Sequence, residues 1–469
     1  MLSIQVIHID LKFMVDRMIK QSKVIITSLI CTGIILISGC VTPETPTSKM
    51  AESSILLTYA DIANVNYLDA LRDAEALQSI IAEFRTDPTK DTFAKAKVAW
   101  LTSRESYGST EIFRLSNGPI DAEEGWIARA YGTLDEQINA WPLDENMIDY
   151  TVNARGERTH GNIIDSTGEF NPGGEENFSV DITKITPDVI SALNENGGDA
   201  NVATGYHAIE FLLWGQDQDY SNFLKDSVTH GAMKAGQRPL SDFVSDKDAS
   251  RRLAYLSAAS DKLVSDLSTV ANAWSKNTST NCDTDARGCY RAALLGELKG
   301  VDAHKNIDKK ESLKNIFSGM GMFIKSELAN ERIGVAVLTP SEEDEQSCFS
   351  DNTHRDIDTN FQGFKNILLG TYDDVEYGVT PIDAVSENTK NKIMKLISKI
   401  ETKIDSINSV AQTSRHFDYQ IQPNDPQARV IVKLKNELRK LGDQMVKVAL
   451  ANGINLSSED VTDAQETEL

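Results

Sequence analysis

The chain has 469 residues, of which 40% are hydrophobic and 25% are charged, and these proportions are ordinary for a soluble globular protein. This length is enough for two or three domains with sizeable hydrophobic cores. The formal net charge of −23 repels phosphate backbones, so the composition argues against nucleic acid as a partner.

The N-terminus has the pattern of an export signal. Lys20 and Lys23 precede an apolar stretch that ends in small residues just before Cys40, so we expect residues 1–39 to be a signal peptide. Cys40 resembles the lipobox cysteine of bacterial lipoproteins, which becomes lipidated and starts the mature chain. An uncleaved transmembrane anchor is the alternative, although the polar stretch after Cys40 is a poor stop-transfer flank. Val41 favours the outer membrane of a Gram-negative envelope, with the protein facing the periplasm or the surface.

The rest of the chain shows the apolar spacing of helices. A lipidated linker, residues 40–52, leads into a long predicted helix, and Asp87 with Pro88 predicts the start of a second helix that ends near residues 116–119. Further helical patterns lie at roughly 240–276, 310–332, 380–408 and 424–451. Alternating strand patterns are hard to find, so the predicted fold class is all-α.

Polar segments divide these helices. Residues 153–184 are rich in Gly, Asn and Ser and predict a long surface loop. The connection at 216–240 is the expected boundary between an N-terminal bundle, residues 53–225, and a C-terminal bundle, residues 226–456. The last residues, 457–469, predict an acidic tail.

The cysteines indicate one disulfide. Cys282 and Cys289 flank six residues in a turn-rich loop of an exported chain, which favours a small-loop disulfide between them. Cys348 is left without an expected partner. The chain contains no C-x-x-C pair, and this excludes a zinc-finger framework.

Two titratable residues, His207 and Glu210, stand in the apolar run TGYHAIEFLLWG at 204–215. Residues three apart share a helix face, and apolar residues cover every other direction, so both side chains should be buried. A buried carboxylate is costly unless it is paired, hydrogen-bonded or bound to a cation. A self-satisfied structural pair and a pair of metal ligands therefore both remain open.

Gly205, His207 and Glu210 form a G-x-H-x-x-E pattern that resembles the signature of the imelysin family. Blocks in the same order along most of the mature chain resemble its iron-regulated protein A branch: 104–121, 139–150, 236–243, 319–337 and 343–368. The resemblance implies two helical bundles related by an internal duplication, with a site between them. It also implies a cell-envelope protein linked to iron, in a family named after a peptidase activity.

Other residues could complete such a site. Glu111 follows the stripe of Phe93, Trp100 and Tyr107 by one turn, so it should face inward, where Arg104 could pair with Glu111 or with Glu210.

The span 351–358 is the best outside source of ligands, and Asp351 and His354 are its candidates. If the halves are duplicated, His354 is the counterpart of His207. Ile357 then occupies the position that corresponds to Glu210, where a second Glu is expected. This difference argues against a symmetric two-metal site.

These observations lead to three hypotheses. The first is a lipoprotein that binds a metal or an iron-linked ligand in iron acquisition, since oxygen and imidazole ligands suit Fe, Mn or Zn. The second is a metallopeptidase with a small ligand or peptide as substrate, in which Glu210 is a ligand or the general base. The third is an envelope protein that docks to a partner through its surface, with His207 and Glu210 as a purely structural pair.

Overall fold

The computed structural model describes residues 48–153, 155–217, 235–338 and 345–463. The predicted signal peptide, Cys40, most of the linker and the last six residues of the acidic tail lie outside these ranges. Most of the predicted boundary segment also lies outside them, so the division into two bundles stays a prediction. Among the described helices, none combines the length and the apolar character that crossing a membrane requires.

The fold class is all-α, as predicted. The α-helices are α2 (Ser48–Thr86), α3 (Lys90–Gly108), α4 (Gly125–Tyr131), α5 (Leu134–Asn139), α6 (Glu145–Ile148), α7 (Pro187–Leu193), α8 (Gly205–Trp214), α10 (Ser241–Val244), α11 (Ala249–Ala273), α12 (Cys289–Leu295), α13 (Lys309–Met322), α14 (Val335–Leu338), α15 (Thr353–Leu369), α16 (Glu387–Thr413), α17 (Phe417–Gln420) and α18 (Ala428–Ala451). The other helical segments are η1 (Glu111–Phe113), η3 (Gly300–Lys305), η4 (Phe323–Gly334), η6 (Pro381–Ala384) and η7 (Glu459–Val461), of which η4 is π-helical. Two antiparallel pairs of very short strands complete the described elements: β1 (Glu169–Phe170) with β2 (Val180–Asp181), and β3 (Thr371–Tyr372) with β4 (Val375–Glu376).

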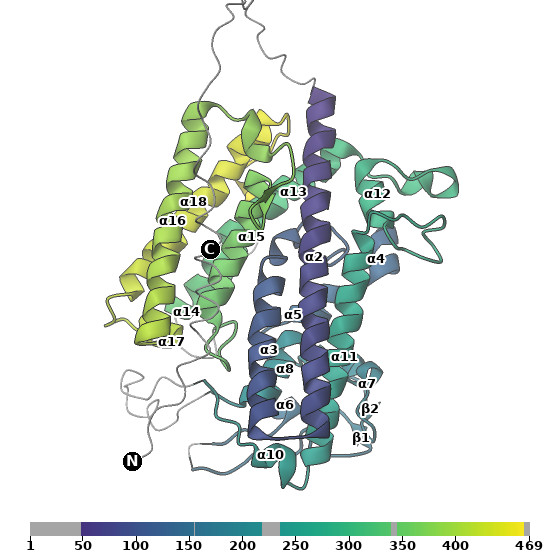
Figure 1. The fold of residues 1–469 in the computed structure, drawn as a ribbon, viewed down its shortest axis with the longest axis vertical. Coiled ribbons are helices and arrows are strands. Elements are labelled where there is room, and N and C mark those ends of the chain that lie inside the picture. Colours follow the sequence, from purple (N-terminus) through teal and green to yellow (C-terminus); the bar gives the residue numbers. More distant parts are fainter. Residues whose placement is uncertain (1–47, 154, 218–234, 339–344, 464–469) are drawn as a thin grey trace, which may run out of the picture. The chain divides into compact units, whose positions relative to one another are not determined.

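The first group of helices comprises α2, α3, α8 and α11, which pack side by side (Figure 1). The cap of α3 differs from the prediction, because Thr89 rather than Asp87 starts this helix. Thr89 and Thr92 accept hydrogen bonds from each other's backbone N–H groups, which forms a capping box. α11 follows the predicted boundary segment, yet it packs on α2 and α8, so the first group extends past residue 225.

The second group comprises α13, η4, α15, α16 and α18 (Figure 1). α13 continues directly into η4, whose wider π-helical turns are frequent at functional sites. The two groups approach closely where α3 meets α15. A Cβ atom on Gly108 would collide with the side chain of Thr359, so the absence of a side chain at Gly108 allows this contact.

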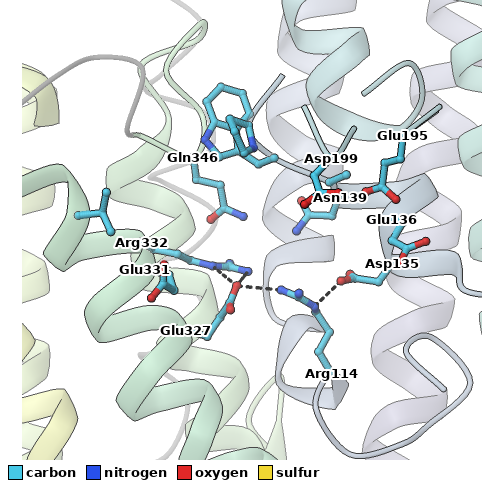
Figure 2. A pocket seen from close by; sticks show the side chains of 14 residues that line it. Arg114, Asp135, Glu136, Asn139, Glu195, Asp199, Glu327, Glu331, Arg332 and Gln346 are labelled. Atoms are coloured by element: carbon cyan, nitrogen blue, oxygen red, sulfur yellow. Dashed lines mark hydrogen bonds and ion pairs between the residues drawn. The ribbon is translucent and has the colours of Figure 1, made fainter. Parts of the chain in front are cut away.

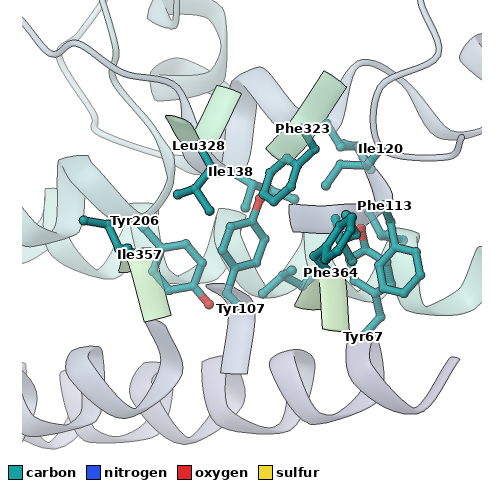
Figure 3. Close-up of a cluster of buried hydrophobic side chains, with 14 of the residues drawn as sticks. Tyr67, Tyr107, Phe113, Ile120, Ile138, Tyr206, Phe323, Leu328, Ile357 and Phe364 are labelled. Atoms are coloured by element: carbon teal, nitrogen blue, oxygen red, sulfur yellow. The ribbon is translucent and has the colours of Figure 1, made fainter. Parts of the chain in front are cut away.

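One hydrophobic core spans both groups. Figure 3 shows Tyr107 of α3 and Tyr206 of α8 close to Phe323 and Leu328 of η4 and to Ile357 of α15. All five side chains are at most 1% exposed. The core therefore holds the two groups together and fixes the relative positions of α8 and α15.

The loop regions follow the predictions in part. The predicted loop at 153–184 contains β1 and β2, whose short pairing has no clear pattern in the sequence. Cys282 and Cys289 form a disulfide, the pairing expected from their spacing, and Cys348 is buried as a free thiol.

Candidate functional site

The helix α8 carries the G-x-H-x-x-E pattern and is buried along its whole length, as its apolar sequence predicts. It packs against α3, α5 and α11. Gly205 adopts a φ of 78° and lies so near the carbonyl of Ile138 that a Cβ atom would collide with it. The first glycine of the pattern is thus required by the close approach of α5 to the start of α8.

His207 and Glu210 form a hydrogen-bonded pair inside the protein. Nδ1 of His207 lies 2.9 Å from Oε2 of Glu210, and both side chains are fully buried. The other carboxyl oxygen, Oε1, accepts hydrogen bonds from the backbone N–H of Ser350 at 3.0 Å and from its hydroxyl at 2.6 Å. Ser350 precedes α15, so the carboxyl group of Glu210 joins the two groups of helices.

Burial keeps both members of this pair uncharged near neutral pH. It raises the pKa of Glu210 to about 8, a rise that the hydrogen bond from the Ser350 hydroxyl opposes. Burial also lowers the pKa of His207 well below its ordinary value, and the positive charge of Arg104 lowers it further. The protonated carboxyl group of Glu210 therefore donates a hydrogen bond through Oε2 to Nδ1 of His207, and the neutral imidazole carries its proton on Nε2.

The second ring nitrogen of His207, Nε2, takes no part in the hydrogen bond with Glu210. Nε2 is fully buried, and no hydrogen-bond partner for it occurs among the described residues. The indole ring of Trp141 packs on the imidazole at a centroid distance of 4.9 Å and also contacts Phe349. Because Trp141 lines a cavity as well, it connects His207 with that cavity.

The cavity has a volume of about 540 Å³ and opens between the two groups of helices. Asp135, Glu136 and Asn139 of α5 line one side of it, together with the Glu195 and Asp199 loop, and Glu327, Glu331 and Arg332 of η4 line the other (Figure 2). Six carboxyl groups and two guanidinium groups, those of Arg114 and Arg332, face this space. We call it the interhelical pocket.

Glu111 lies beneath the interhelical pocket in a buried ionic network, facing inward as predicted. Arg104 pairs with Glu111 at 3.4 Å, as anticipated, and also with Asp356 of α15 at 2.9 Å. Arg332 of η4 holds the other oxygen of Glu111 at 2.5 Å. Burial raises the pKa of Glu111, but Arg332 and Arg104 outweigh it and hold this pKa below its ordinary value. The ionised carboxylate of Glu111 is thus satisfied by protein cations.

Asp351 and His354 form a third, separate cluster. Nδ1 of His354 lies 3.1 Å from the backbone carbonyl of Asp351, and the Asp351 carboxylate lies 3.4 Å from Nε2 of His416. Burial lowers the pKa of His354 to about 4, and the positive charge of Arg355 adds to this effect. His354 is therefore a neutral imidazole near pH 7.

The structure thus places the five predicted ligands in three clusters. His207 and Glu210 lie together, whereas Glu111 belongs to the arginine network and Asp351 contacts His354 and His416. Within the described ranges, no three His, Cys, Asp or Glu side chains are grouped so that they could hold a metal ion. The predicted five-residue set is not assembled as one coordination sphere.

Sequence reasoning missed several residues that shape the site. Trp141 lies far from His207 in the sequence, so their contact is visible only in the tertiary fold. Arg332 and Ser350 carry no local signal, because a single arginine or serine in a helix or loop is common. The carboxylates of α5, of the Glu195 and Asp199 loop and of η4 lie far apart in the sequence, so no local pattern indicates that they converge on one pocket.

Comparisons with known proteins agree with this fold. The chain matches the family model described as imelysin, Peptidase_M75, over residues 63–445. No curated protein matches it. A crystal structure from Parabacteroides distasonis ATCC 8503, described as a candidate iron-regulated protein A precursor, superposes with a TM-score of 0.56 at 16% identity, covering 87% of this chain and 97% of that one. An imelysin-like protein from Psychrobacter arcticum 273-4 gives a TM-score of 0.49 at 13% identity, covering 88% and 98%.

The structural likeness concerns the fold alone, because the sequence identities are low. The family match is independent of it and covers more than half of the chain, including α8 and its G-x-H-x-x-E pattern. This protein belongs to the imelysin family.

Proposed function

We propose that this chain is a lipid-anchored protein of the cell envelope that binds a metal in chelated form at the interhelical pocket, in the service of iron acquisition. The observation that carries the proposal is Nε2 of His207, a buried nitrogen without a described hydrogen-bond partner. A buried polar atom is costly unless something satisfies it. An imidazole nitrogen in this situation is a donor for a metal.

The contacts of the other imidazole nitrogen, Nδ1, fit this role. Histidines that bind metals through one ring nitrogen usually hydrogen-bond a carboxylate or a carbonyl through the other nitrogen. Glu210 occupies that position at Nδ1, while both of its oxygens are engaged by His207 and Ser350. Glu210 thus orients His207 and is not itself a ligand.

A bare ion does not fit the described residues, because they supply no group of three ligands. A chelated metal fits better, since the chelator brings most of the ligands and leaves a position for His207. The pocket of about 540 Å³ has the size of a small-molecule site. Trp141 would have to turn aside for a chelate to reach Nε2. A metallopeptidase would need a group of protein ligands that holds a metal ion, and the described residues supply no such group of three. The peptidase alternative therefore has less support than the binding of a chelated metal.

Metal binding to His207 changes the number of protons that His207 and Glu210 carry. When Nε2 binds a metal through its lone pair, the proton on Nε2 leaves, the carboxyl proton of Glu210 moves to Nδ1, and Glu210 becomes ionised. Binding therefore releases one proton, and affinity should rise by about tenfold per pH unit up to pH 8, where Glu210 ionises by itself.

Ferric nitrilotriacetate is a suitable probe, because this chelator leaves coordination positions of the iron open. We expect His207→Gln to weaken its binding by at least about tenfold, since the protein ligand is lost. Titration calorimetry on both proteins at constant pH measures this difference. The matched control is His304→Gln, because His304 is an exposed histidine outside the pocket, and its replacement should leave the affinity unchanged. Equal affinities of wild type and His207→Gln for ferric nitrilotriacetate would contradict the proposal.

A further inference from the structure

The mouth of the interhelical pocket is formed by three carboxylates without cationic partners. Glu136, Glu195 and Asp199 line the pocket, and no described lysine or arginine forms an ion pair with any of them. Arg114, by contrast, neutralises Asp135 at 2.7 Å and Glu327 at 3.0 Å. We call Glu136, Glu195 and Asp199 the acidic mouth. Figure 2 shows its side chains on the same side of the pocket, across from Glu327 and Glu331.

A second observation points to a ligand in this space. Gln346 is only 6% exposed, and its side chain projects into the pocket between Arg332 and Asn139 (Figure 2). Its amide oxygen, Oε1, has no hydrogen-bond partner among the described residues. A buried carbonyl oxygen of this kind is satisfied when a hydrogen-bond donor or a cation enters the pocket.

We propose that the acidic mouth and Oε1 of Gln346 together bind a small organic cation that carries two or more alkylammonium groups. An alkylammonium group presents three N–H donors and a positive charge, which suits carboxylate and amide oxygens. With two such groups on one chain, one would meet the mouth and the other Oε1 of Gln346. A bare divalent metal is a poorer candidate, because the described carboxylates and histidines form no cluster of three that could hold one.

The electrostatics of the mouth agree with this assignment. Burial, the neighbouring carboxylates of Glu136 and Asp199 and, to a smaller extent, Asp135 together raise the pKa of Glu195 to about 7. Like-charged groups at this spacing resist full ionisation until a cation joins them. A bound ammonium group would therefore stabilise the ionised mouth.

This inference names the ligand chemistry of the pocket and rests on the proposed function only in sharing that pocket. An ammonium-bearing arm on a chelator and a free polyamine offer the same group. Spermidine is a metal-free probe of this chemistry. Its binding can fail while the His207-dependent binding of ferric nitrilotriacetate succeeds, or the reverse, so the two ideas are tested separately.

The experiment is titration calorimetry of the full chain with spermidine at physiological salt, which suppresses non-specific attraction to the acidic surface. We expect Glu136→Gln/Glu195→Gln to weaken binding by about tenfold or more, and Gln346→Leu to weaken it severalfold. The control is Asp373→Asn/Asp374→Asn. Like the mouth variant, it removes two carboxylates, but from an exposed turn outside the pocket. Asparagine tolerates the positive φ values of that turn, 52° and 64°.

The outcomes separate clearly. Weakened binding in the mouth and Gln346 variants, with the control close to wild type, supports the inference. An equal loss in the control variant would overturn it, because attraction to net charge would then explain the binding. Magnesium ion binding at the same site with the same affinity would also overturn it, because the mouth would then be a general cation site. Circular dichroism on each variant confirms that it is folded.

Discussion

Replacing Arg104 by methionine is expected to lower the free energy of unfolding by about 3–5 kcal/mol, because it leaves two buried carboxylates with less compensation. Arg104 is fully buried and pairs with Asp356 and Glu111, and it also donates a hydrogen bond to Asn139. The buried carboxylate of Asp356 is destabilised most. Burial already raises its pKa even with Arg104 present, whereas Arg332 still holds Glu111 in the variant. Denaturant unfolding monitored by circular dichroism measures the change.

Two controls show whether the network or general charge loss is responsible. Arg72 pairs with Asp69 and Asp73 on the surface, where its side chain is 64% exposed, and Arg72→Met should cost less than about 1 kcal/mol. Adding Asp356→Asn to Arg104→Met should recover part of the lost stability, because the uncompensated charge disappears. If the double variant is as unstable as the sum of its parts, the cost does not come from the Arg104–Asp356 pair.

The second large effect concerns the pH dependence of stability in Glu210→Gln. Glu210 has a folded-state pKa of about 8, raised by burial, so the folded protein retains a proton there that the unfolded chain has lost. The free energy of unfolding contributed by Glu210 therefore falls as the pH rises towards 8. His207 has the opposite effect below about pH 6.5, because only the unfolded chain gains a proton there, so the two effects oppose each other at lower pH.

Between pH 6.5 and 8, Glu210 acts without this opposition. The slope is at most about 1.4 kcal/mol per pH unit, so wild type should lose roughly 2 kcal/mol relative to Glu210→Gln over this window. Other titrating groups, such as Glu195, are common to both proteins and cancel in the difference. Parallel stability curves for the two proteins would show that Glu210 is already ionised in the folded state.

Local sequence signals were sufficient for the fold class. The apolar spacing predicted the helices that became α2, α3, α11, α13, α16 and α18, because amphipathic periodicity is a local property. It did not predict that α13 runs on into π-helical turns or that Thr89 caps α3, since both depend on how these segments pack. The internal duplication remains a prediction.

For the site, the sequence indicated the buried pair but not its surroundings. His207 and Glu210 were recognisable because two polar residues interrupt an all-apolar helix. The expectation that Glu111, Asp351 and His354 converge on them depended on long-range geometry, which local spacing does not determine. Helix spacing left Glu111 and Glu210 as possible partners of Arg104, but it did not indicate that Arg104 also pairs with Asp356 or that Arg332 pairs with Glu111.

The most direct test of the central claim, that Nε2 of His207 is the protein's ligand for a chelated metal, is a crystal structure of the protein soaked with ferric nitrilotriacetate above pH 8. Anomalous scattering at the iron edge locates the metal. We expect an iron peak at coordination distance from Nε2 of His207, with Trp141 displaced and Glu210 still hydrogen-bonded to Nδ1. An iron peak elsewhere, or an undisturbed Trp141 over an imidazole without iron, would contradict it.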